Sequence, residues 1–338
     1  MLSNQRSQYR VPRKWIGLVL IIVAGLLLGS CSQPPKVFRV GVLSGLSFVA
    51  SITDGLKARM AELGYVEGKN IIYDVQATDF DMDKYKSVLQ KFVADKVDVI
   101  FVFPTEATME AKAATQGTNI PVVFDFALIE GMGLVESVRA PGGNITGVRY
   151  PGPDIVLKRF EIMRELVPQA KQMLIPYQKG YPIATPQLEA LRPVAEAAGV
   201  KLIEVPAESA ADLEAQLQTL AESANNQFDA ILFLAEPLTV TPDPFIVIGK
   251  FAAEHNIPVG GALMSAGGYD SIFGVNVDNI AVGKQAAPLI DKIFKGIPAG
   301  TIPVVSAENY IQINYKAAQA QGLTVSDGLL NQANEIIR

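Results

Sequence analysis

The stretches VDVIFVF (residues 97–103) and FDAILF (residues 228–233) decide the fold. Each is a short run of mostly apolar side chains, which predicts a strand buried on both faces at the centre of a parallel sheet. Each leads through a helical pattern to an Ile-Pro-Val step, at residues 120–122 and 257–259. The repeated order predicts two similar α/β units rather than one large sheet.

Strand and helix patterns alternate on both sides of these two stretches. In the first half, apolar runs predict strands over 37–43, 70–75 and 120–124, and helical spacing predicts helices over 49–63, 83–94 and 105–115. The sequence RAPGGN (residues 139–144) breaks any regular element and marks the join. Beyond it we expect helices over 156–167 and 212–224 and a strand over 199–203. A further strand over 273–277 and helix over 280–295 have no counterpart in the first half.

The unmatched strand and helix predict that the chain returns to the first unit. We therefore expect an α/β protein with two Rossmann-like parallel-sheet lobes joined by a multi-strand hinge. The first lobe would comprise residues 37–147 plus about 276–303, and the second residues 148–275 plus about 304–338. Several parallel crossings allow two lobes to close about a cleft while resisting twist.

The first thirty residues have the layout of an export signal. A basic segment precedes WIGLVLIIVAGLLLGS (residues 15–30), which is short for a membrane span and typical of a signal peptide over 1–30. The sequence LGSC (residues 28–31) resembles the lipobox of bacterial lipoproteins, which implies that Cys31 carries a lipid. Residues 31–36 then form a tether. The alternative is an uncleaved anchor, and in both cases the body lies outside the cytoplasm.

Charge and residue counts exclude several classes of function. Of the 338 residues, 29 are Lys or Arg and 34 are Asp or Glu, for a net charge of −5. Four of the basic residues lie in the leader, so the body is more acidic still and is a poor partner for nucleic acid. The single cysteine excludes an intrachain disulfide.

Catalytic and metal-binding patterns are missing from the sequence. The one histidine, His255, stands where a helix is expected to end, and no nucleophile elbow or phosphate-binding motif occurs. The acidic run Asp79 to Asp83 lacks the glycine and glutamate of a calcium loop and predicts helix capping instead. We therefore expect a binding protein without enzymatic activity, cofactor or metal.

In parallel α/β domains, ligands collect at the carboxyl ends of the strands, where helices begin. The strand-to-helix turns and the returning strand therefore supply the candidate ligand-binding residues: Ser44, Ser47, Phe48, Thr105, Glu106, Phe126, Tyr181, Glu236, Thr239 and Asn276. We expect Glu106 or Glu236 to receive a cationic group, helix N-termini a carboxylate, and the aromatic rings an apolar portion. The alternatives are helix capping by the hydroxyls, core packing by the rings and dipole compensation by the glutamates.

Four motifs resemble one known family. They are LGYVEGKNI (residues 63–71), NIPVVF (119–124), PGGNITGV (141–148) and LLNQANEII (329–337). Together they resemble the ABC transporter substrate-binding family of tryptophan- and tyrosine-binding proteins, although residues 128–130 depart from its pattern. The resemblance implies a type I periplasmic-binding fold. It also implies capture of a small organic solute, a class that includes aromatic and aliphatic amino acids, for delivery to an ABC permease with its ATPase.

Two other functions are compatible with the sequence. A sensory receptor would use the same cleft to signal to a chemoreceptor or a kinase, and an exported hydrolase would use Asp or Glu for catalysis. We expect a monomer attached to the membrane through its lipid anchor.

Overall fold

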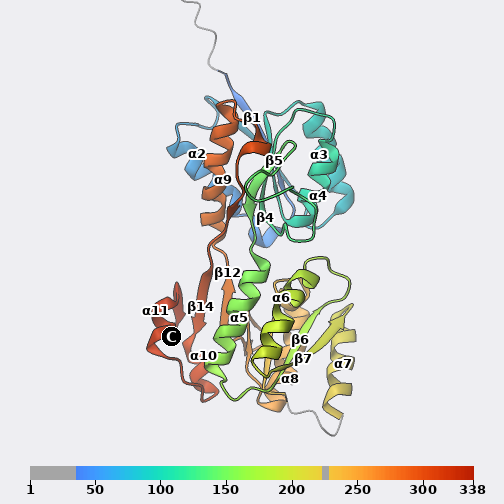
Figure 1. Cartoon of the computed structure of the whole chain (residues 1–338), viewed down its shortest axis with the longest axis vertical. Coiled ribbons are helices and arrows are strands. Elements are labelled where there is room, and N and C mark those ends of the chain that lie inside the picture. The colour runs from blue at the N-terminus through green and yellow to red at the C-terminus, as the bar shows by residue number, and fades with distance from the viewer. Residues whose placement is uncertain (1–35, 223–227) are drawn as a thin grey trace, which may run out of the picture.

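The computed structural model describes residues 36–222 and 228–338, which form two α/β lobes placed end to end (Figure 1). The predicted signal peptide and Cys31 lie outside the described residues. We call the upper lobe in Figure 1, which contains β1 (Phe38–Ser44), the first lobe, and the lower one, which contains β6 (Gln172–Gln178), the second lobe.

The first lobe is built on a parallel sheet with the order β13-β5-β4-β3-β1-β2. Its other strands are β2 (Ile71–Ala77), β3 (Val99–Phe103), β4 (Val122–Ala127), β5 (Ile145–Arg149) and β13 (Val305–Ser306). Every residue of β3 is buried, as its apolar sequence predicts for a central strand. One face is covered by α2 (Ile52–Glu62) and α9 (Asn279–Phe294), and the other by α3 (Met82–Ala94) and α4 (Thr105–Ala114).

The second lobe repeats this plan on a smaller scale. Its parallel sheet has the order β7-β6-β8-β9, with β7 (Lys201–Ala207), β8 (Ala230–Leu232) and β9 (Val259–Gly260) beside β6. The helices α5 (Gly152–Leu166) and α6 (Ala184–Ala197) pack on one face, and α7 (Ala210–Glu222) and α8 (Pro242–His255) on the other. Because β2-β1-β3-β4 and β7-β6-β8-β9 have the same strand order, the predicted duplication is confirmed.

A third sheet and several short elements complete the second lobe. Strand β14 (Tyr310–Asn314) pairs antiparallel with β12 (Phe273–Asn276) and parallel with β15 (Glu335–Ile337). The short strands β10 (Ser265–Ala266) and β11 (Tyr269–Asp270) form a hairpin. The remaining helices of the described chain are α10 (Tyr315–Ala320), α11 (Asp327–Gln332) and the 3-10 turns η1 (Ser47–Val49), η2 (Leu238–Val240) and η3 (Ala299–Thr301).

The described chain crosses between the lobes three times. It leaves the first lobe between β5 and α5, returns between β12 and α9, and leaves again between β13 and β14 (Figure 1). Strand pairing places residues just after the expected boundaries at 148 and 304 in the first lobe. The reason is that Val305 and Ser306 pair with Val148 and Arg149, so both segments still belong to the first sheet.

The return to the first lobe is secured by close contact between α2 and α9. A Cβ atom added at Gly55 would lie 2.1 Å from the Ile280 carbonyl oxygen, and one added at Gly283 would lie 2.0 Å from that of Ile52. Two helices can approach this closely only where neither carries a side chain at the contact. The pair of glycines therefore fixes α9 against α2.

The first prediction concerns this contact. Replacing Gly283 by Ala should lower the free energy of unfolding by about 1–3 kcal/mol, because the added methyl group forces the helices apart. The matched control is Gly328→Ala in α11, where the nearest atom to a new Cβ is the Ser326 Oγ at 3.5 Å. Urea denaturation measures both variants, and equal stability of the two would contradict the assignment.

Candidate functional site

A cavity of about 60 Å³ lies where the carboxyl ends of the strands of both lobes meet. Its walls come from the segments that follow β1, β3, β4, β5, β6, β8 and β12, together with α5. The lining residues are Leu46, Phe48, Pro104, Thr105, Glu106, Phe126, Tyr150, Arg159, Tyr181, Ile183, Ala235, Glu236, Pro237, Val240 and Asn276. Both repeats therefore contribute corresponding turns to one enclosed space.

Most of the candidate residues from the sequence line this cavity. The structure brings together Phe48, Thr105, Glu106, Phe126, Tyr181, Glu236 and Asn276. The other three, Ser44, Ser47 and Thr239, are not part of the lining. Ser44 is buried at the end of β1, the Ser47 backbone N–H donates to Asp79 Oδ1 on the outside of the lobe, and Thr239 lies behind Glu236. A turn presents only some of its side chains to the cleft, and these three side chains are not among them.

Glu106 is the unpartnered charge of the cavity. It lies in the first turn of α4, and both of its carboxylate oxygens are buried without a well-formed hydrogen bond among the described residues, although the Tyr181 hydroxyl lies close enough to interact with them. Buried polar atoms are normally paired, and an unpaired buried charge is costly. The arrangement therefore suits a ligand that brings a positive charge and N–H donors to Glu106.

Glu236 has a different environment, although it follows the matching strand of the second repeat. Its Oε2 accepts from the backbone N–H groups of Gln178 (3.1 Å) and Leu238 (2.8 Å). Its Oε1 accepts from the backbone N–H (2.9 Å) and the hydroxyl (2.6 Å) of Thr239. Because four protein donors already satisfy this carboxylate, the expectation that Glu236 receives a ligand cation is replaced by a role in holding η2 against β6.

The same hydrogen bonds change the expected place for a ligand carboxylate. The N–H groups at the start of η2 are occupied by Glu236 itself. At α4, the first turn carries Glu106, which repels an anion. Nor does Thr105 cap its helix, since its Oγ1 accepts from the backbone N–H of Leu128 at 3.0 Å. These two helix starts are therefore poor sites for an anionic group.

Aromatic rings form much of the remaining wall. The ring of Phe126 lies 4.7 Å from that of Tyr150, measured between centroids, and Phe48 is 57% exposed on η1. Phe126 has a φ of 49°, a conformation that is rare for a bulky residue. Burial, followed by the nearby Glu106 carboxylate, raises the pKa of Tyr181, so its phenol stays protonated.

Tyr150 and Arg159 line the cavity but were not among the candidates. Arg159 is 1% exposed and donates to the backbone carbonyls of Val275 and Phe233. One sequence signal pointed to it, because residue 159 falls on the apolar face of α5, where an arginine is out of place. Tyr150 stands at a crossing between the lobes and gave no comparable signal.

An ion-pair bridge lies beside the first crossing. Arg149, the last residue of β5, pairs with Glu130 of the first lobe and, at 3.0 Å, with Asp154 in the first turn of α5 in the second lobe. Glu130 belongs to the segment that departs from the family pattern. The bridge therefore connects both lobes through a side chain at the hinge.

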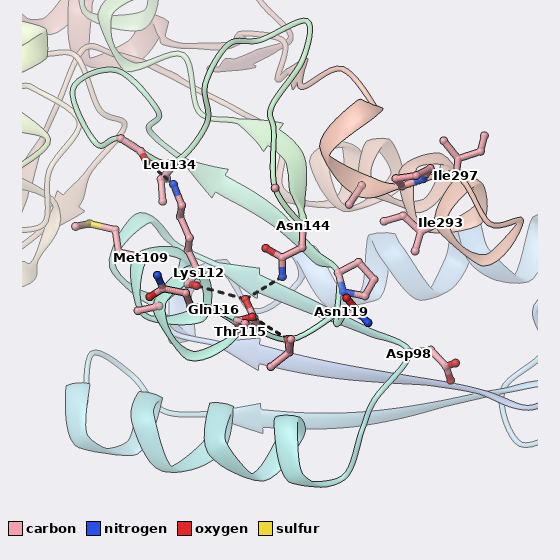
Figure 2. A pocket seen from close by; sticks show the side chains of 18 of the residues that line it. Asp98, Met109, Lys112, Thr115, Gln116, Asn119, Leu134, Asn144, Ile293 and Ile297 are labelled. Carbon is pink, nitrogen blue, oxygen red and sulfur yellow. Dashed lines mark hydrogen bonds between the residues drawn. The ribbon is translucent and has the colours of Figure 1, made fainter.

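A larger groove of about 970 Å³ lies at the opposite end of the first lobe, where the strands begin (Figure 2). Several of its polar side chains already have partners within the protein. The Asn144 Nδ2 donates to Thr115 Oγ1 at 3.1 Å, and Lys112 Nζ donates to the Gly133 carbonyl at 2.6 Å. None of the side chains that line the groove is buried without a hydrogen-bond partner. The groove therefore has no polar group that needs a ligand to satisfy it, unlike the smaller cavity.

The structure bears on two other expectations from the sequence. The Asp79 to Asp83 run caps a helix as predicted, because Asp81 Oδ1 accepts from the Lys84 backbone N–H at 3.1 Å. Within residues 36–222 and 228–338, no group of three or more His, Cys, Asp or Glu side chains has an arrangement that could hold a metal ion. In the same part of the chain, no helix has the length and apolar character needed to cross a bilayer.

The second prediction separates the two glutamates by their effect on stability. Glu236→Gln should lower the free energy of unfolding by about 2 kcal/mol or more, because an amide cannot accept all four donors. Glu106→Gln should leave stability unchanged or raise it, because it removes a buried charge without a partner. Urea denaturation of both variants without added solute measures this, and an equal loss in both would contradict the contrast.

The third prediction concerns Asp125, which is fully buried next to Phe126 and has one unpartnered oxygen. Burial raises the pKa of this carboxyl group well above its usual range. The native state therefore holds the proton of Asp125 more tightly than the unfolded chain does. This contribution to the free energy of unfolding is present at low pH and is lost as the pH rises above ~3.9, the pKa of Asp in the unfolded chain. Asp125→Asn removes this titration.

The wild-type free energy of unfolding, measured relative to that of Asp125→Asn, should fall as the pH rises above about 4. Urea denaturation at several pH values gives this difference directly. A difference that stays constant over the range would show that Asp125 does not titrate as its burial indicates.

Comparisons with known proteins agree with the observed fold. A family model described as ABC transporter substrate binding protein matches residues 40–337. The tyrosine-binding protein of Clostridioides difficile (strain R20291) is 26% identical over 270 residues, which cover 79% of this chain and 75% of that protein.

Solved structures show the same two-lobed architecture. A conserved domain protein of Vibrio cholerae has a TM-score of 0.75 and 26% identity, covering 89% of this chain and 100% of the other. An ABC domain from Streptococcus pneumoniae in complex with L-Trp has a TM-score of 0.74 and 23% identity, with the same coverage.

These likenesses confirm the expected type I periplasmic-binding fold. ABC transporter substrate-binding proteins, the class that the family model describes, bind small-molecule solutes outside the cytoplasm and deliver them to ABC permeases. They are not enzymes. The family match spans nearly all of the described residues, including every segment that lines the cavity. The chain therefore belongs to the family of ABC transporter substrate-binding proteins.

Proposed function

We propose that this protein is the solute-binding component of an ABC importer and captures a small organic ammonium compound, the class that includes the amino acids. The observation that carries the proposal is the Glu106 carboxylate, which is buried in the cleft with both oxygens unpartnered. An ammonium group supplies the charge and the N–H donors that these oxygens lack.

Capture requires the lobes to move. The cavity of about 60 Å³ is far smaller than the 300–1,000 Å³ typical of ligand pockets. A solute therefore enters while the lobes are apart, and closing the hinge brings Glu106 of the first lobe and Tyr181 of the second onto it. Contacts that exist only in the closed form would make the bound solute favour closure.

The relatives support an amino acid as the first solute to test. One is named a tyrosine-binding protein, and one solved structure of the same fold holds L-Trp. The rings of Phe48, Phe126, Tyr150 and Tyr181 would contact an apolar or aromatic portion of such a solute.

Attachment to the membrane is part of the proposal. The lipobox-like LGSC at residues 28–31 supports cleavage before Cys31 and lipid attachment to its thiol. A lipid-anchored monomer would then present its cleft to the permease from the outer side of the membrane. Replacing Cys31 by Ser should release the protein into the soluble fraction.

The fourth prediction tests solute capture. Native mass spectrometry of the full-length protein in detergent identifies any solute that co-purifies, and thermal-shift assays follow with amino acids and organic amines. At least one ammonium compound should stabilise the protein, by about 2.7 kcal/mol at one hundred times its Kd. Glu106→Gln should abolish that stabilisation. Stabilisation by neutral sugars or carboxylic acids, with no response to any ammonium compound, would contradict the proposal.

A further inference from the structure

The fully buried side-chain atoms of the cavity that lack a partner are hydrogen-bond acceptors. Among the described lining residues, the buried side-chain atoms without a partner are Glu106 Oε1, Glu106 Oε2 and Asn276 Oδ1. A primary ammonium group brings three N–H donors and no acceptor. A carboxylate brings only acceptors, and the fully buried side chains of the lining offer it no unpartnered donor.

Arg159 is the one cationic residue among those that line the cavity, and it is already engaged. Its Nε and Nη2 donate to the Val275 carbonyl at 3.0 and 2.7 Å, and its Nη1 donates to the Phe233 carbonyl at 3.0 Å. Every nitrogen of the guanidinium group thus has a backbone partner. These bonds connect α5 to the segments around β8 and β12, which is a structural role.

The charges of the lining do not balance without a solute. Glu106 and Glu236 are acidic and Arg159 is basic, which leaves one net negative charge when all three are ionised. Burial raises the pKa of Glu236, but the three backbone N–H groups that donate to it favour the carboxylate form, and it interacts electrostatically with Arg159. Glu106 is therefore the charge left over, and a zwitterionic solute, being neutral overall, would not neutralise it.

Aromatic rings surround the same space. Phe48, Phe126, Tyr150 and Tyr181 all line the cavity with Glu106. A cation is attracted to the faces of such rings, most strongly when water is excluded, whereas a carboxylate is not. Rings and carboxylate together suit an organic cation.

We infer that the cleft selects organic amines that carry a net positive charge over the zwitterionic amino acids with the same side chain. The solute would place its ammonium group on Glu106 and Asn276 and its apolar portion among the four rings. This inference rests on the proposed function and narrows the solute class within it.

Matched pairs of compounds that differ only in the carboxylate test the inference. Isothermal titration of the full-length protein in detergent compares tyramine with tyrosine, tryptamine with tryptophan, and phenethylamine with phenylalanine. The amine should bind at least ~10-fold more tightly than the amino acid in any pair that binds. Equal or tighter binding of the amino acid would overturn the inference and leave the proposed function intact. No binding by any of the six compounds also overturns the inference, whereas the proposed function is decided separately by the thermal-shift assays with other amino acids and amines.

Two variants show whether Glu106 is the cause of the preference. Glu106→Gln should weaken amine binding by ~30-fold or more and bring the two members of a pair to similar affinities. The matched control is Glu110→Gln, which removes the same charge one turn further along α4 and outside the cavity. The control should retain the affinity and preference of the wild type. A preference that survives in Glu106→Gln would overturn the assignment of Glu106.

Discussion

The carboxyl ends of two sets of parallel strands face one another across three chain crossings, and the site depends on this constraint. A parallel strand must be followed by a crossover connection, so its carboxyl end leads into a loop and a helix start. Because both lobes turn these ends toward the hinge, corresponding turns of two repeats enclose one cavity. The glycine contact between α2 and α9 holds the returning helix in place.

The two repeats carry glutamates at near-equivalent turns, but the surroundings of these glutamates give them different roles. Glu236 is held by four donors from its own lobe, so its charge stabilises the turn that carries it. Glu106 has no such set of donors, and interacts instead with the Tyr181 hydroxyl of the other lobe. A carboxylate that already accepts hydrogen bonds from the protein gains little from a solute. A carboxylate that lacks such hydrogen bonds gains them only when the solute binds. Because of this difference, Glu106 presents a negative charge to the solute, whereas the charge of Glu236 is already compensated by its own lobe.

The sequence predicted the layers of the fold and the turns of the site, because both follow from local patterns. Apolar runs such as VDVIFVF identify central strands, and the rule that ligands collect at strand ends pointed to Phe48, Glu106 and Tyr181. Hydrogen-bond partners are not local in this sense. That Glu236 is satisfied depends on Gln178, which is 58 residues away, and Val305 joins the first sheet only through pairing with Val148. Arg159 could have been noticed as a charge on an apolar helix face, but its backbone partners could not have been predicted from its neighbours in the sequence.

A crystal structure of the protein with a bound organic amine such as tyramine tests the central claim most directly. The account predicts closed lobes, with the ammonium nitrogen within ~3.2 Å of both Glu106 and Asn276 and the ring among Phe48, Phe126, Tyr150 and Tyr181. An ammonium group that instead lies against Glu236, or one that faces solvent while the ring alone is buried, would contradict it.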